Sequence, residues 1–131
     1  MEQLKNLVLY REHFYEDRPL NKPSIEDYKG LLPVKLADDI IKYLESGYRL
    51  LEFVSPIEDP YNPEDKVPFV IFTDGVYVWD EVIISWLKKY RVQLPREFLE
   101  YFDKINKKTV DHDSIPIGLS GLLKEAEEIF V

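Results

Sequence analysis

Hydrophobic residues in the middle of the chain follow two periodicities in succession. Residues 67–79, VPFVIFTDGVYVW, hold two apolar runs on either side of an Asp-Gly pair. A type I′ turn needs positive φ at both central residues, and Asp-Gly supplies this with little strain, so Asp74 and Gly75 are predicted at the centre of a hairpin turn. This register pairs Thr73 with Val76 and leaves both faces of the hairpin apolar. We therefore expect the hairpin to be covered on both sides or to lie centrally in its sheet.

The spacing changes to that of a helix directly after the hairpin. Asp80 is placed to cap the first turn by accepting hydrogen bonds from free backbone N–H groups. Apolar residues then recur at helical intervals, at Val82, Ile83, Trp86, Leu87 and Tyr90. Trp79 and Trp86 are the only tryptophans in the chain. We interpret both as core residues, and a part in an exposed binding groove is the alternative.

Residues before the hairpin predict one more strand and one more long helix. The segment 48–54, YRLLEFV, reads as a strand that pairs with the hairpin. A helix is expected to include Pro33 in its first turn and to end at Gly47, in the left-handed conformation, with an apolar face formed by Ala37, Ile40, Ile41 and Leu44. Ser24 resembles the start of a short helix. Residues 4–15 fit a helix or a strand, and periodicity does not decide between the two.

Residues after the central helix predict two further helices. One begins near Pro95 and buries a stripe formed by Phe98, Leu99, Phe102 and Ile105. The other runs from about Ser120 to the end of the chain. Together the patterns predict an α+β fold in which a small antiparallel sheet, made of the hairpin 67–79 and the strand 48–54, packs with several amphipathic helices. Residues 1–131 are expected to form a single globular domain.

The connection between the predicted strand and the hairpin is the best candidate for a recognition surface. Residues 55–66, SPIEDPYNPEDK, contain three prolines and four acidic residues, so we expect no regular structure there. The segment is also long for a link between two strands, and loops of that length are often functional. Its candidate partner-binding residues are Glu58, Asp59, Tyr61, Glu64 and Asp65.

Charge is distributed unevenly along the chain, whose net charge is −8. Residues 1–87 hold 17 acids and 9 bases, residues 88–108 hold 3 acids and 7 bases, and residues 109–131 hold 5 acids and 1 base. An acidic protein repels phosphate backbones, so nucleic acid is not an expected partner. In the basic stretch, lysines at predicted helix ends complement the helix dipole. Whether the stretch has a further role is left open; its members are Lys88, Lys89, Arg91, Arg96, Lys104, Lys107 and Lys108.

The sequence contains no motif that indicates catalysis. It has no cysteine, which excludes a thiol nucleophile and a zinc–thiolate site. It also lacks a glycine-rich phosphate loop, a nucleophile elbow and an HExxH motif. The run Asp111-His112-Asp113 offers metal-binding atoms, but three adjacent residues rarely converge on one ion, so we interpret it as a loop. We therefore expect no catalytic residue, no metal site and no cofactor.

The beginning of the chain predicts the compartment. The residues MEQLKNLVLYREHF hold too short an apolar run for a signal sequence or a membrane span. We therefore expect a cytoplasmic protein that does not bind membranes.

Several motifs resemble those of a group of small bacterial proteins. The shared pattern is a T-D-G hairpin followed by tryptophan, a helix that ends in tyrosine, and an L-P-x-E-F helix; here it reads TDGVYVW at 73–79, WLKKY at 86–90 and LPREFLEYF at 94–102. YRE at 10–12 and YLESG at 43–47 fit the same pattern, so the resemblance covers roughly residues 10–102. In that group a proline often follows the tryptophan, whereas Asp80 stands here.

The group is similar in size, acidity and lack of catalytic motifs to immunity proteins of bacterial toxin systems. The resemblance implies a non-enzymatic interaction protein that binds and neutralises a toxin, and it supplies no catalytic residue. Nuclease toxins are basic because they hold phosphates, and an acidic protein associates quickly with such a surface. The expected partner is therefore a protein, and the resemblance implies a basic toxin domain. A regulatory or ligand-binding module, and an enzyme with an unrecognised site, are the alternatives.

Overall fold

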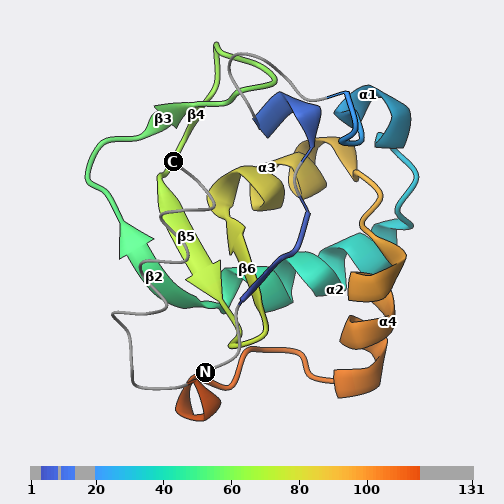
Figure 1. Ribbon diagram of the computed structural model, residues 1–131, viewed down its shortest axis with the longest axis vertical. Helices are drawn as coiled ribbons and strands as arrows, with labels where there is room; N and C mark the ends of the chain where they lie inside the picture. The colour runs from blue at the N-terminus through green and yellow to red at the C-terminus, as the bar shows by residue number, and fades with distance from the viewer. Residues whose placement is uncertain (1–3, 9, 14–19, 116–131) are drawn as a thin grey trace.

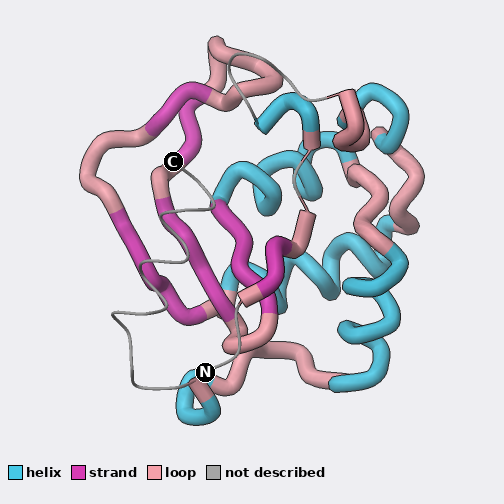
Figure 2. Tube along the Cα trace, in the orientation of Figure 1, coloured by secondary structure: helices cyan, strands magenta, loops and turns pink. Residues whose placement is uncertain are grey.

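A computed structural model describes residues 4–8, 10–13 and 20–115 of the chain (Figure 1). The predicted helix from about Ser120 lies outside these residues. The described elements are short strands and four α-helices, with a sheet at one side of the molecule and the helices around it (Figures 1 and 2). The predicted α+β class, with a small sheet and several helices, is confirmed.

The main sheet has four strands in the order β1-β6-β5-β2. Its bounds are β1 Lys5–Asn6, β2 Tyr48–Glu52, β5 Val70–Thr73 and β6 Tyr77–Asp80. Strand β2 pairs antiparallel with β5, as predicted, with a register irregularity between Arg49 and Leu51. The antiparallel pairing predicted for the hairpin and strand 48–54 is confirmed. Strand β1, which was not predicted, runs parallel to β6, so the complete sheet is mixed. Strand β1 and a 3₁₀ turn at Arg11–His13 both lie in residues 4–15, the segment for which periodicity did not decide between helix and strand.

The β5–β6 hairpin differs from the prediction in register. Thr73 pairs with Val78 and Phe72 with Trp79, so Gly75 and Val76 are the central turn residues, not Asp74 and Gly75. Asp74 Oδ1 accepts hydrogen bonds from the backbone N–H groups of Val76 (2.9 Å) and Tyr77 (2.8 Å), which places Asp74 beside the turn. Gly75 has φ +94°, but neither Asp74 nor Val76 has a positive φ. A type I′ turn needs positive φ at both central residues, so it is excluded in the predicted and in the observed register.

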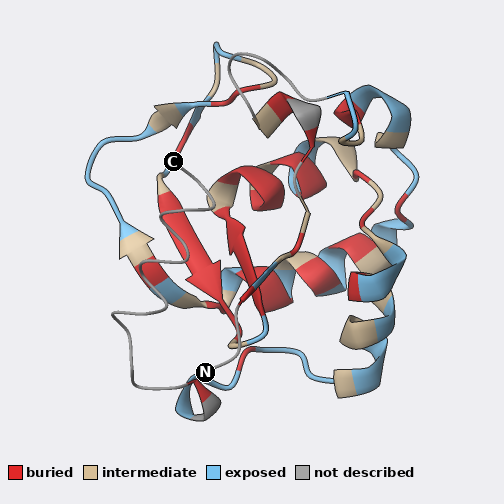
Figure 3. Ribbon diagram, viewed as in Figure 1, coloured by how far each residue is buried: buried red, intermediate tan, exposed pale blue. Residues whose placement is uncertain are grey.

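The slip in register leaves the two faces of the hairpin unchanged, because the pairing moves by two residues in total. Every residue of β5 and β6 is buried (Figure 3). The prediction of a central, covered hairpin is confirmed. Helix α3, Glu81–Tyr90, follows β6 without a loop. It contacts β5, β6, strand β4 (Lys66–Val67) and helix α2 (Val34–Glu45).

The predicted cap and core of α3 are also confirmed. The Asp80 carboxylate accepts a hydrogen bond from the backbone N–H of Ile83 at 3.0 Å. Trp79 and Trp86 are buried, and both indole N–H groups have a partner. Trp79 Nε1 donates to the backbone oxygen of Leu44 at 3.2 Å, which joins β6 to the end of α2.

Glycine is required at position 47, after helix α2, for a different reason from the one predicted. Helix α2 spans Val34–Glu45, directly after Pro33. Gly47 does not have a positive φ, so the predicted left-handed stop is wrong. A Cβ atom on Gly47 would instead lie 2.7 Å from Trp79 Cζ2 and 2.9 Å from Phe72 Cβ. The residue must therefore be glycine because the backbone lies directly against the Trp79 ring and the Cβ of Phe72.

Two helices complete the described fold. Helix α1, Ile25–Tyr28, is capped by Ser24, whose Oγ accepts a hydrogen bond from the N–H of Glu26. Helix α4, Arg96–Ile105, begins after Pro95. Of its predicted buried stripe only Phe98 is buried; the other three residues are half-buried, so α4 leaves part of its apolar face accessible: Leu99, Phe102 and Ile105.

Candidate interaction surface

The segment predicted to lack regular structure contains a second, two-stranded sheet. Strand β3, Ile57–Glu58, pairs antiparallel with β4, Lys66–Val67. The prediction of an irregular loop is therefore wrong. In Figure 1 this β3–β4 hairpin lies beyond the end of the main sheet, on the same side of the view as β2. Its inner turn is closed by backbone hydrogen bonds from Asp59 N–H to Asp65 O (2.9 Å) and from Asp65 N–H to Asn62 O (3.0 Å).

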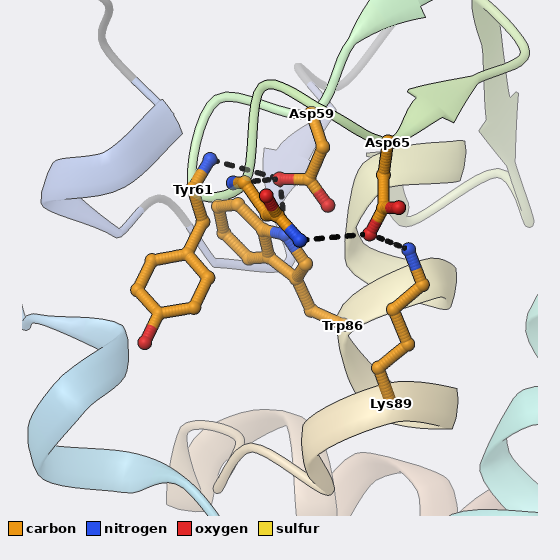
Figure 4. A network of polar contacts seen from close by, with 6 residues as sticks. Asp59, Tyr61, Asp65, Trp86 and Lys89 are labelled. Atoms are coloured by element: carbon orange, nitrogen blue, oxygen red, sulfur yellow. Dashed lines mark hydrogen bonds and ion pairs between the residues drawn. The ribbon is translucent and has the colours of Figure 1, made fainter.

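Asp59 fixes the hairpin to the core, as Figure 4 shows. Its Oδ1 accepts hydrogen bonds from the Trp86 indole N–H (2.9 Å) and from the backbone N–H groups of Tyr61 (2.8 Å) and Asn62 (3.2 Å). The residue is 0% exposed, so the expectation that it belongs to an exposed surface is wrong. The prolines and acidic residues around Asp59 predict a solvent-exposed segment. Asp59 points inward because Trp86 of α3 offers its indole N–H as a hydrogen-bond donor.

Two other acidic residues of the hairpin carry ion pairs. Asp65 Oδ2 lies 2.8 Å from Lys89 Nζ of helix α3, and Glu58 Oε1 lies 3.5 Å from Lys66 Nζ on the paired strand. Such half-exposed pairs contribute little stability, about 0–1 kcal/mol each. They also offset part of the negative charge of the segment. Glu64 is exposed and forms no ion pair with the residues that the structure describes.

Tyr61 packs edge-on against two aromatic rings of α3 instead of standing free. Its ring centroid is 5.3 Å from that of Tyr90 and 6.4 Å from that of Trp86. Its hydroxyl donates a hydrogen bond to the Glu26 carboxylate, and Lys29 Nζ lies 4.7 Å from its ring centroid. The Tyr61 and Lys29 hydrogen bonds hold the pKa of Glu26 below its usual value. Tyr61 thus joins the hairpin to α1 and α3, and only part of it is available to a partner.

An exposed apolar patch beside the hairpin was missed from the sequence. Phe53 is 51% exposed and Val54 is 103% exposed, because β2 ends at Glu52 and not at residue 54 as predicted. Together with Pro56 and Pro68 they line a shallow depression next to β4. The sequence signal was present, since two apolar residues precede the Ser-Pro that starts the connection, but strand periodicity placed them in the sheet.

The hairpin surface is defined by these outward residues: Phe53, Val54, Pro56, Glu58, Glu64 and Pro68. Of the five candidate residues, the structure brings Glu58 and Glu64 to this surface. Asp65 and Tyr61 are half-buried on the side of the hairpin that packs against the protein, and Asp59 is buried.

Asp111, His112 and Asp113 form a capped 3₁₀ turn. Asp111 Oδ1 accepts a hydrogen bond from the N–H of Asp113 at 3.1 Å, and His112 Nε2 lies 2.7 Å from the backbone oxygen of Ser46. Within residues 4–8, 10–13 and 20–115, no three His, Asp or Glu side chains are grouped so that they could hold a metal ion. In the same part of the chain, no helix has the length and hydrophobicity needed to cross a bilayer.

A buried carboxylate at the β5–β6 turn organises two tyrosines from different helices. Asp74 Oδ2 accepts hydrogen bonds from Tyr43 of α2 (2.6 Å) and from Tyr101 of α4 (2.9 Å). Burial raises the pKa of both phenols well above its ordinary value, and the negative Asp74 raises it further. This cluster links the turn to both helices and is structural in character.

Comparisons of the chain with models of known protein families, with curated proteins and with solved structures gave no match.

Proposed function

We propose that the protein is a non-enzymatic interaction protein that binds a basic protein partner through the hairpin surface. The observation that supports this most is the hydrogen bond between Trp86 and Asp59, which fixes a projecting hairpin to the core. A segment held in one conformation before binding loses less conformational entropy when a partner arrives. The hairpin is therefore suited to recognition.

The chemistry of the surface agrees with that role. Exposed Phe53 and Val54 supply apolar area, which in protein interfaces forms the centre of the contact. Glu58 and Glu64 supply negative charge at its edge, where charges increase the association rate more than the affinity. The net charge of −8 adds a long-range attraction for a basic partner.

We further propose that this partner is a bacterial toxin domain, so that the protein acts as an immunity protein in the cytoplasm. The proposal is supported by the T-D-G hairpin and L-P-x-E-F helix pattern, by the acidic charge and by the preformed hairpin. A nuclease-type toxin would fit best, because its phosphate-binding surface is positively charged.

Survival during toxin expression tests the proposal. The toxic domain encoded nearest to this gene is induced in bacteria that also express the wild-type chain, the Val54→Asp variant or the matched Val34→Asp variant. Val34 is also an exposed valine, 58% exposed, but it lies on α2 away from the hairpin. We expect protection by the wild type and by Val34→Asp and its loss with Val54→Asp. Absence of protection by the wild type, or equal protection by all three, would contradict the proposal.

A further inference from the structure

The basic residues of the described chain differ in whether a carboxylate neutralises them. Seven of them form an ion pair within 4 Å: Lys5, Lys29, Arg49, Lys66, Lys88, Lys89 and Arg96. Lys35, Lys42, Lys107 and Lys108 form none with the described residues, and all four line one groove between α2 and α4. In a chain of net charge −8, the groove therefore gathers four lysines that no described carboxylate neutralises.

Three apolar side chains line this groove together with the polar ones. Helices α2 and α4 contact each other through Tyr43 and Phe102, whose ring centroids are 5.5 Å apart. Phe102 and half-buried Leu36 and Leu99 line the groove, which has a volume of about 800 Å³. The groove explains why two residues of the α4 stripe, Leu99 and Phe102, are only half-buried, because both line it.

We propose that the α2–α4 groove binds an acidic amphipathic helix of a partner protein. An apolar stripe on such a helix would cover Leu36, Leu99 and Phe102, and its flanking carboxylates would pair with the lysines at the rim. Lys35 and Lys42 are seven residues apart on α2, so they lie on one face of the helix, about 10 Å apart along its axis. Carboxylates two turns apart on the bound helix match this spacing.

The groove also contains two carboxylates, which favour a peptide over an anionic membrane. Asp39 and Asp103 line it together with the lysines. A uniformly negative surface would be repelled at these two positions, whereas a helix can present apolar or basic residues there. The proposal is independent of the hairpin surface, because the groove is formed by different elements and selects the opposite charge.

Fluorescence anisotropy with the full chain tests the proposal. The probe is a fluorescein-labelled amphipathic helix of about five turns, with leucines on one face and glutamates on both flanks, and a lysine-flanked version is its counterpart. The groove variant is Lys35→Gln, Lys42→Gln and Lys108→Gln. The matched control replaces three lysines elsewhere and changes the net charge equally: Lys5→Gln, Lys66→Gln and Lys88→Gln.

We expect saturable binding of the glutamate-flanked peptide only. The groove variant should weaken it about tenfold, since three exposed ion pairs together contribute on that order. The control should weaken it less than about twofold. Equal weakening by both variants would show that net charge alone is responsible and would overturn the proposal.

Other occupants of the groove give different results, each of which would overturn the proposal. Binding of phosphatidylserine vesicles without peptide binding would indicate a membrane surface. A dimer in sedimentation equilibrium that the groove variant dissociates would indicate a second copy. Peptide binding that appears only after Glu125→Gln, Glu127→Gln and Glu128→Gln would indicate that the chain's own acidic end competes for the groove.

Discussion

Replacing Asp59 with alanine tests how the β3–β4 hairpin is held. The substitution removes the acceptor of three hydrogen bonds, which come from the Trp86 indole at 2.9 Å and from two backbone N–H groups at 2.8 and 3.2 Å. The Trp86 side chain is buried, so its N–H group cannot turn to water. An unsatisfied buried donor costs about 1–3 kcal/mol, and the two backbone donors, which are only partly buried, cost less.

We therefore expect Asp59→Ala to lower the free energy of unfolding by about 2–4 kcal/mol. Urea unfolding followed by tryptophan fluorescence measures this loss, because both tryptophans are buried. Asp59→Asn keeps an acceptor oxygen and should cost clearly less. Glu58→Ala, on the neighbouring exposed residue, should change stability by less than about 0.5 kcal/mol.

The contributions of the three donors can be separated. Trp86→Phe removes the indole donor, so combining it with Asp59→Ala in a double-mutant cycle should give a coupling energy of about 1 kcal/mol or more. Equal stability of Asp59→Ala and Glu58→Ala, or a coupling energy of zero, would refute the conclusion that the Trp86–Asp59 bond anchors the hairpin.

Three further predictions concern the core and the β5–β6 turn. Gly47→Ala should lower the free energy of unfolding by about 1–3 kcal/mol in a thermal melt, because its Cβ would lie 2.7 Å from Trp79. Gly30→Ala is the control, because nothing lies within 4 Å of the added Cβ. It should cost only about 1 kcal/mol, which comes from the φ of +68°. Gly75→Val should cost roughly 1–3 kcal/mol because a β-branched residue is strained at positive φ, and an unchanged melt would contradict the observed φ of +94°. The raised pKa values of Tyr43 and Tyr101 contribute stability that is complete below the unfolded tyrosine pKa of about 10 and is lost as pH rises toward the folded values. Unfolding free energy should therefore fall above about pH 10, with these two tyrosines ionising only on unfolding, and simultaneous ionisation of every tyrosine in the folded protein would contradict this.

The sequence predicted the centre of the fold because local signals agree there. Asp80 caps α3, and the apolar residues of both hairpin arms have no alternative to burial. The register of the hairpin was wrong since an Asp-Gly pair fits two positions of a turn, and the choice depends on where the Asp74 side chain finds donors. Those donors include Tyr43 and Tyr101, which are 31 and 27 residues away in sequence.

The exposure of part of the candidate segment was predictable, and its internal arrangement was not. Glu58 and Glu64 are exposed, as their charge predicts, and their role in binding stays a prediction. The burial of Asp59 depends on Trp86, 27 residues later, and no local pattern encodes that contact. The parallel pairing of β1 with β6 joins segments about 70 residues apart and was unpredictable for the same reason.

The association kinetics of the toxin domain with this protein test the central claim most directly, that the hairpin surface binds a basic partner. Stopped-flow rates are measured at low and high ionic strength for the wild type, for Glu58→Lys with Glu64→Lys, and for Arg96→Glu as the charge-reversal control. Salt screens charges over about 10 Å at 0.1 M, so the wild-type association rate should fall steeply with salt while dissociation changes little. The hairpin reversal should slow association about tenfold at low salt, and Arg96→Glu should leave it unchanged or slightly faster. A silent hairpin reversal together with a damaging Arg96→Glu would contradict the account and place the contact on the basic side of the protein.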